Sequence, residues 1–224
     1  PRTEKEPRMS ERTIVHLMRH GEVHNPEGVL YGRLPQFMLS ELGQQMAVAA
    51  ADFLSKNEIV HLVASPLERA QQTVEPLAKL LEAPVTTDER VIEADNLFEG
   101  KTVGVGAGAF SNPKNWWMLR NPFRPSWGEP YKEIAARMQA AVADAREAAR
   151  GHEAVIVSHQ LPVWIARQAY EKKSFVHDPR KRQCTLASIT SLTFDGDDYV
   201  GFTYAEPAAH LLPDNLDGKF VGGA

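Results

Sequence analysis

The chain has 224 residues, with 25 Lys or Arg and 29 Asp or Glu, so its net charge is −4 at pH 7. This charge argues against a general nucleic-acid partner, which would need a basic surface. No apolar stretch approaches the length of a membrane span, and no apolar core follows the charged N-terminal residues as in a secretory signal. The only cysteine, Cys184, cannot form an internal disulfide. We therefore expect a cytoplasmic protein that binds neither nucleic acid nor membranes.

Short apolar runs alternate with helical patterns along the chain, which predicts an α/β fold with a parallel sheet. We expect strands at 13–19, 59–64, 84–87 and 154–158, and a hairpin of two further strands at 188–194 and 199–204. We expect four helices between them: one capped at Ser40, one that begins near Pro66, and two over 131–150 and 161–170.

One large domain accounts for most of the length. We divide the chain into a tail at 1–11, a domain at 12–205 and a C-terminal tail at 206–224. Residues 95–130 are rich in Gly and Pro and show no regular pattern, so we expect an inserted loop region near 101–130. Within it, four aromatic residues and two arginines of the segment 115–127 could form a lid or a loop packed on itself: Trp116, Trp117, Phe123, Trp127, Arg120 and Arg124.

Polar residues follow three of the predicted strands at the point where each strand ends. They are Arg19 and His20 after the first strand, Ser65 and Arg69 after the second, and Ser158 and His159 after the fourth. In parallel sheets, ligands bind beyond the carboxyl ends of the strands. We therefore expect these side chains to meet at one rim.

Two arginines and two histidines at one rim suit the chemistry of a phosphoryl group. The guanidinium fork matches phosphate oxygens and stabilises their charge during transfer. A neutral imidazole is a nucleophile near pH 7 and can accept the group covalently. A carboxylic acid is then needed to protonate the departing oxygen.

At these motifs the chain resembles the histidine phosphatase superfamily, in its phosphoglycerate mutase-like branch. The resemblance rests on LMRHGE at 17–22, SPLERAQQT at 65–73 and VSH at 157–159, and it extends over about 13–205. It implies a single three-layer α/β domain with a mostly parallel central sheet flanked by helices. It also implies catalysis without a metal or cofactor, and a small phosphorylated metabolite as the partner.

The resemblance implies a role for each matching residue. These roles are nucleophile for His20, phosphate clamps for Arg19 and Arg69, completion of the pocket for His159, support in or beside the pocket for Glu22 and Asn25, and proton donor for Glu93. Glu93 lies one residue closer to the following Gly100 than the family pattern has it, and Glu89, Asp95 and Glu99 compete for its role. Gln160 also departs from the pattern, since many relatives have Gly after the second histidine.

We expect a phosphatase that hydrolyses phosphomonoesters through phospho-His20. Two alternatives stay open: a mutase, which returns the phosphoryl group to another oxygen of the same molecule, and a catalytically weak relative that binds a phosphorylated ligand. The sequence does not name the substrate or fix the oligomeric state, and it leaves a homodimer open.

Overall fold

A six-stranded mixed sheet forms the centre of the molecule in the computed structural model, which describes residues 11–96, 99–100 and 128–212. The strands are β1 (Arg12–Arg19), β2 (Ile59–Ala64), β3 (Val85–Thr87), β4 (Glu153–Ser158), β5 (Ile189–Asp195) and β6 (Asp198–Ala205). Their order is β3-β2-β4-β1-β5-β6. The first four are parallel to one another, whereas β5 is antiparallel to both neighbours.

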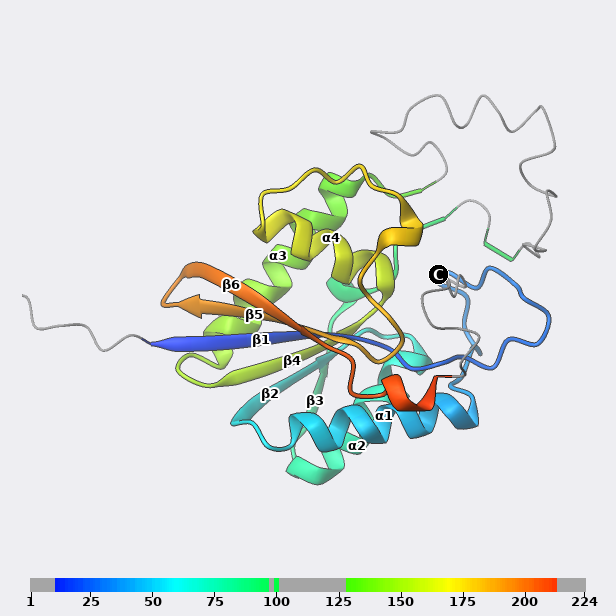
Figure 1. Cartoon of the computed structure of the whole chain (residues 1–224), viewed down its shortest axis with the longest axis horizontal. Helices are drawn as coiled ribbons and strands as arrows, with labels where there is room; N and C mark the ends of the chain where they lie inside the picture. The colour runs from blue at the N-terminus through cyan, green and yellow to red at the C-terminus, as the bar shows by residue number, and fades with distance from the viewer. Residues whose placement is uncertain (1–10, 97–98, 101–127, 213–224) are drawn as a thin grey trace, which may run out of the picture.

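Helices cover both faces of this sheet and make three layers. The helices are α1 (Glu41–Leu54), α2 (Glu68–Leu81), α3 (Tyr131–Ala148) and α4 (Gln160–Tyr170), with short 3-10 turns η1 (Glu89–Val91), η3 (Pro179–Lys181) and η4 (Ala209–Leu211). α1 and α2 lie on one face, and α3 and α4 lie on the other (Figure 1). The predicted single α/β domain with a mostly parallel sheet is confirmed.

β1 is buried on both faces because its apolar residues are consecutive rather than alternating with polar ones. Leu17 packs into the cluster of apolar residues under α3 and α4. The adjacent Met18 points the other way, into the cluster under α1 and α2. This central strand therefore holds Arg19 and His20 rigidly at its carboxyl end.

One helix begins later than the sequence predicts. Pro66 is not in the first turn of a helix, because α2 begins at Glu68 after an extended Leu67. The cause is the sheet: the Ser65 N–H donates to the Val157 carbonyl at 2.9 Å, which continues the β2–β4 ladder past Ala64. Ser40, by contrast, caps α1 as predicted, with its hydroxyl accepting from the Gly43 N–H at 2.9 Å.

Part of the predicted C-terminal tail is folded. Residues 206–212 carry η4, whose preceding Ala208 is buried in the α1 and α2 cluster. Leu211 and Leu212 pack on the same cluster, so apolar contact holds the segment against the domain. Three parts of the chain lie outside the described residues: the N-terminal tail up to residue 10, residues 213–224, and most of the inserted region (101–127), with the four aromatic residues and two arginines named above.

Two glycines allow the segment after β1 to press against the first turn of α1. A β-carbon on Gly43 would lie 2.0 Å from the Glu22 carbonyl oxygen, and one on Gly21 would lie 2.5 Å from the Gly43 carbonyl oxygen. Both atoms belong to backbone that cannot turn away as a side chain could. The close approach therefore fixes the position of the residues that follow Arg19.

Gly43→Ala should lower the free energy of unfolding by about 3 kcal/mol, the upper part of the usual range for overpacking. The loss should appear even though alanine favours helices by about 1 kcal/mol over glycine. Denaturant unfolding of both proteins measures it. Gly201→Ala is the control, because a β-carbon on Gly201 meets nothing within 4 Å. Equal stability of the two variants would show that the segment after β1 moves freely.

Candidate active site

The carboxyl ends of β1, β2 and β4 meet at one edge of the sheet, as predicted. Arg19 pairs with Ser158 in the β1–β4 register, and the His20 N–H donates to the Ser158 carbonyl at 3.1 Å. His159 follows directly as the residue before α4. The sheet register thus brings residues 139 positions apart in the chain to the same rim.

His20 is held as a neutral imidazole with one nitrogen available. Its Nδ1 lies 2.7 Å from the Gly21 carbonyl, which can only accept, so Nδ1 carries the proton. Nε2 then holds a lone pair, is buried and has no hydrogen-bond partner among the described residues. Burial, followed by the charges of Arg69 and Arg19, lowers the pKa of His20 well below its ordinary value. The ring is therefore neutral at neutral pH, with its proton on Nδ1, and Nε2 is able to attack phosphorus.

Arg69 is a fully buried cation whose side chain reaches into the same pocket. One Nη donates to the Gly32 carbonyl, and the guanidinium lies over the Tyr31 ring, 4.7 Å from its centroid. Its Nε and other Nη have no partner among the described residues, and no carboxylate there lies within ion-pair distance. A buried charge without a counter-ion is costly, so these donors favour an anion in the pocket.

Arg19 is the second buried arginine, only 2% exposed. Its Nη1 donates to the Cys184 carbonyl at 2.9 Å, which aims the guanidinium along the rim. Its charge lowers the pKa of His20, the next residue in the chain. The structure thus places both predicted phosphate clamps next to the predicted nucleophile.

His159 and Glu93 complete the buried group. The two histidine rings lie edge to face with centroids 5.2 Å apart. Nε2 of His159 shares a 2.7 Å hydrogen bond with the Ser65 hydroxyl, and its Nδ1 lies 3.9 Å from Oε2 of Glu93. Burial, more than any charge, lowers the pKa of His159 well below its ordinary value.

Glu93 has the environment of a carboxylic acid kept protonated. It is 2% exposed, and burial raises its pKa against the opposing effects of the Ala94 N–H and of nearby arginines. Oε1 accepts from the Ala94 N–H at 2.8 Å, whereas Oε2 has no hydrogen-bond partner among the described residues. Of the competing carboxylates, Glu89 and Asp95 are exposed, and Glu99 lies near Gly32 and Arg69. The geometry favours Glu93 as the acid.

Two arginines anchor the backbone that carries Glu93. Arg33 donates from Nε to the Glu93 carbonyl at 2.7 Å, and Arg137 donates to the carbonyls of Arg90 and Ile92, each at 2.7 Å. Both arginines also bind the Glu129 carboxylate. No motif in the sequence pointed to Arg137, whereas Gly32-Arg33 matches the family pattern weakly.

The side chains of Glu22 and Asn25 are engaged within their own loop. Glu22 accepts from the Ser40 hydroxyl at 2.6 Å, and Asn25 closes its loop through hydrogen bonds to both backbone groups of Val29. These contacts shape the segment beside the pocket. Direct substrate contact by either residue stays a prediction.

Tyr31 and Thr73 were not singled out from the sequence, yet both contact the central residues. Tyr31 stacks with Arg69, and Thr73 accepts from the Gly21 N–H at 3.1 Å while donating to the Arg69 carbonyl at 2.6 Å. Thr73 belongs to the motif at 65–73, so the motif was the available signal. Nothing in the sequence pointed to Tyr31.

Comparison with known proteins identifies the family. The model of the histidine phosphatase superfamily, branch 1, matches residues 15–205. The chain belongs to this superfamily. An uncharacterized protein of Mycobacterium tuberculosis, Rv0525, is 56% identical over 201 residues, which is 90% of this chain and all of that protein.

Solved histidine phosphatase structures share the fold. The mycobacterial glucosyl-3-phosphoglycerate phosphatase Rv2419c is 26% identical, with a TM-score of 0.70 over 88% of this chain and 98% of that chain. A phosphoserine phosphatase variant from Entamoeba histolytica in complex with phosphoserine has a TM-score of 0.72 at 22% identity, covering 89% and 100% of the two chains, and shows the fold alone. Among curated relatives, a probable phosphoglycerate mutase of Salmonella choleraesuis is 25% identical over 78% of this chain and 83% of its own.

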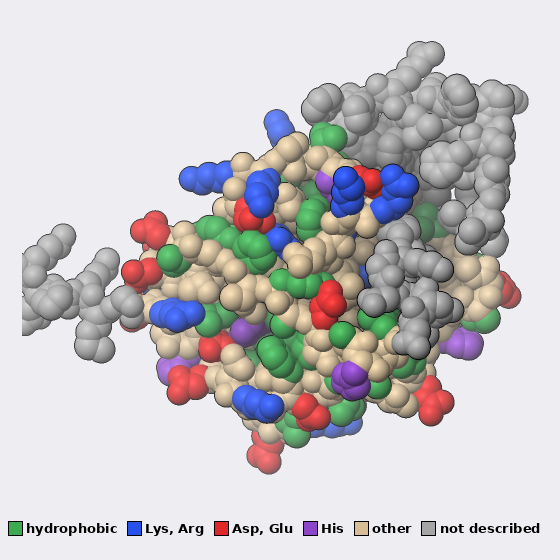
Figure 2. Space-filling view, viewed as in Figure 1, with side chains coloured by type: hydrophobic (Ala, Val, Ile, Leu, Met, Phe, Trp, Pro, Cys, Tyr) green, Lys and Arg blue, Asp and Glu red, His purple; other side chains and the backbone are tan. Residues whose placement is uncertain are grey.

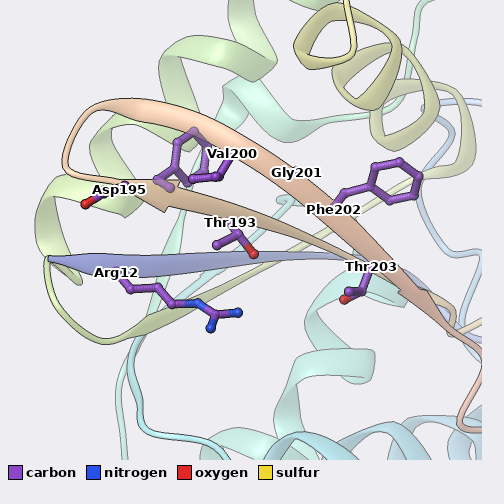
Figure 3. A pocket seen from close by; sticks show the side chains of 8 residues that line it. Arg12, Thr193, Asp195, Val200, Gly201, Phe202 and Thr203 are labelled. Carbon is purple, nitrogen blue, oxygen red and sulfur yellow. The ribbon is translucent and has the colours of Figure 1, made fainter. Parts of the chain in front are cut away.

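A separate hollow of about 400 Å³ lies along β5 and β6. Arg12, Thr193 and Thr203 are among the residues that line it (Figure 3). Arg12 begins β1, whereas Arg19 ends it, so this hollow extends toward the opposite end of the sheet from His20. It contributes no residue to the group around His20.

Two other kinds of feature, a metal site and a membrane-spanning helix, are absent from the described residues. Within 11–96, 99–100 and 128–212, no three His, Cys, Asp or Glu side chains gather as metal ligands. No helix in these ranges is both long and apolar enough to cross a membrane.

Proposed function

We propose that this protein is a phosphatase that hydrolyses phosphomonoesters of small metabolites through a phosphohistidine on His20, without a metal. The observation that carries the proposal is the buried lone pair on Nε2 of His20 beside the unsatisfied donors of Arg69. A phosphoryl group supplies what both lack, because its phosphorus accepts the lone pair and its oxygens accept the hydrogen bonds.

In the first step, Nε2 of His20 attacks phosphorus as the bond from phosphorus to the ester oxygen breaks. Glu93, whose pKa is raised by burial, donates its proton to that departing oxygen. Arg19 and Arg69 contact the phosphoryl oxygens and stabilise their charge in the transition state. The alcohol leaves, and His20 carries the phosphoryl group on Nε2.

In the second step, Glu93 is a carboxylate and accepts a proton from water as that water attacks phosphorus. The bond from phosphorus to Nε2 breaks, the electron pair returns to His20, and inorganic phosphate leaves. The Gly21 carbonyl keeps the proton on Nδ1 throughout, so His20 returns to the same tautomer.

A mutase would use the same first step and differ only in what accepts the phosphoryl group. Hydrolysis is favoured because the inserted region contains only two arginines, Arg120 and Arg124, a sparse version of the basic cluster typical of mutases. A weak ligand-binding relative is disfavoured because the buried acid Glu93 lies 3.9 Å from His159.

The test is a screen of the purified protein against phosphorylated metabolites and phosphopeptides, scoring phosphate release and transfer separately. It should include 2- and 3-phosphoglycerate and glucosyl-3-phosphoglycerate, the ester named for the structural relative. Release of phosphate from small esters in the presence of a strong chelator is the expected result. Interconversion of the phosphoglycerates without release would establish the mutase, and binding without turnover would establish the weak relative.

A further inference from the structure

We propose that Arg182 forms a second anion subsite beside the phosphoryl pocket, and that it selects phosphate esters whose alcohol portion carries a carboxylate. This inference rests on the proposed phosphatase function and adds a substrate class to it. Arg182 lies in the segment between η3 and β5, outside every motif that the sequence analysis used.

Arg182 is joined to the rim of the pocket by a chain of hydrogen bonds. Its Nη1 donates to Oε1 of Gln160 at 3.4 Å, and Nε2 of Gln160 donates to the Cys184 carbonyl at 3.4 Å. That carbonyl also accepts from Nη1 of Arg19. Gln160, where many relatives have glycine, therefore ties the guanidinium of Arg182 to the group that aims Arg19.

The other contacts of Arg182 are to neutral groups. Its Nε donates to Nε2 of His177 at 2.7 Å, while Nδ1 of His177 lies 2.6 Å from the Phe175 carbonyl and so carries the proton. His177 is therefore neutral, and burial keeps its pKa low. No carboxylate among the described residues lies within ion-pair distance of Arg182, and its Nη2 makes no hydrogen bond to them.

Other partly buried arginines of this chain do have carboxylate partners. Arg167 pairs with Glu171 at 3.0 Å, and Arg137 pairs with Glu129 at 2.8 Å. Burial lowers the pKa of Arg182, the effect of a charge placed in a poorly solvated position. A partly desolvated guanidinium without its own counter-ion is an anion-binding group, as Arg69 is.

We place Arg182 on the departing side of the substrate. Its hydrogen bond to Gln160 holds it next to the carbonyl that aims Arg19, and its charge opposes the rise in the pKa of Glu93, the proposed donor to the leaving oxygen. With Nε and Nη1 already bonded to neutral acceptors, the free Nη2 suits one singly charged carboxylate. Figure 2 shows Lys and Arg side chains with an acidic one between them on this face of the molecule. Arg180, unlike Arg182, is exposed and pairs with a carboxylate, that of Asp178 just before η3.

The experiment compares matched esters with and without the carboxylate: phosphoglycolate against ethyl phosphate, and 3-phosphoglycerate against glycerol 3-phosphate. In the wild type, kcat/KM should favour the acid of each pair by about tenfold or more, as for one charge-assisted hydrogen bond. Arg182→Gln should remove that preference, mainly through KM, so that the acid and the neutral ester of each pair are used about equally. Arg182→Lys should restore part of the preference.

Arg180→Gln is the control, because Arg180 is two residues away, is exposed and loses the same charge. It should keep the preference. A second measurement uses only the wild type, so it holds if Arg182→Gln fails to fold: phosphonoacetate should inhibit p-nitrophenyl phosphate hydrolysis about tenfold more strongly than propylphosphonate. Equal use of both esters and equal inhibition would overturn the subsite but leave the phosphatase standing. Hydrolysis of no phosphomonoester would overturn the phosphatase itself.

Discussion

His20→Ala should lower kcat/KM for every phosphomonoester by about 10⁴-fold or more, the usual scale for loss of a catalytic nucleophile. The variant lacks Nε2, and no other nucleophile among the described residues occupies the same position between Arg69 and Arg19. Steady-state hydrolysis of p-nitrophenyl phosphate measures the loss. Wild-type protein given a radiolabelled phosphate ester should also acquire an acid-labile, alkali-stable label, which His20→Ala should not acquire.

His24→Ala is the matched control, because His24 lies four residues further on and is exposed. It should keep wild-type activity and labelling. Thermal unfolding of both variants checks that any loss is chemical rather than structural. Hydrolysis by His20→Ala at the wild-type rate would show that the phosphohistidine mechanism is wrong.

Glu93→Gln should slow esters according to how badly their alcohol leaves. An alkyl phosphate needs a proton on its departing oxygen, so its kcat/KM should fall by about 10²- to 10⁴-fold, the usual contribution of a general acid. An aryl phosphate with a stable phenolate should lose less than about tenfold in the same parameter. Comparing ethyl phosphate with p-nitrophenyl phosphate in the two proteins measures the difference.

Glu89→Gln serves as the control for this change, since Glu89 is an exposed carboxylate four residues earlier. It should slow neither ester. Equal slowing of both esters by Glu93→Gln would show that another group donates the proton. Glu99, which lies near Arg69, would then be the next candidate.

The pH dependence of hydrolysis tests the roles of Glu93 and His20 together. The acid must be protonated, so hydrolysis of ethyl phosphate should fall as pH rises through the raised pKa of Glu93. The nucleophile must be neutral, so it should also fall as pH drops through the lowered pKa of His20. Glu93→Gln should lose the decline in activity at high pH and keep the decline at low pH. Both proteins are measured with the same ester, so the ester's own ionisation affects both profiles equally. Survival of the decline at high pH in the variant would contradict the assignment.

The strand ends were predictable because they are encoded locally. Consecutive β-branched and apolar residues make β1, β2 and β4, and the polar residues that follow each strand mark where burial stops. The motif residues of the active site lie at those ends, so strand prediction alone placed them on one rim. Ser40 was also predictable, since a capping hydroxyl needs only the next three residues.

Glu93 shows where local reasoning stopped. Several other carboxylates lie within six residues of Glu93, and spacing alone left three of them as candidates for the proton donor besides Glu93 itself. Burial separates them, and the backbone at Glu93 is held by hydrogen bonds from Arg33 and Arg137, which lie in other parts of the chain. A contact of that kind is absent from any window of sequence around residue 93.

The sequence by itself determined the α/β class, the family and the three motifs, because these follow from local patterns of hydrophobicity and from residues at fixed spacing. Only the tertiary structure decided which atoms are available for chemistry. The tautomer of His20, the absence of a carboxylate partner for Arg69 among the described residues and the hydrogen bond from Arg182 to Gln160 depend on desolvation and on contacts between distant segments. The physical reason is that the pKa of a group and the pairing of a charge depend on the atoms that surround it, and those atoms come together only when the chain folds.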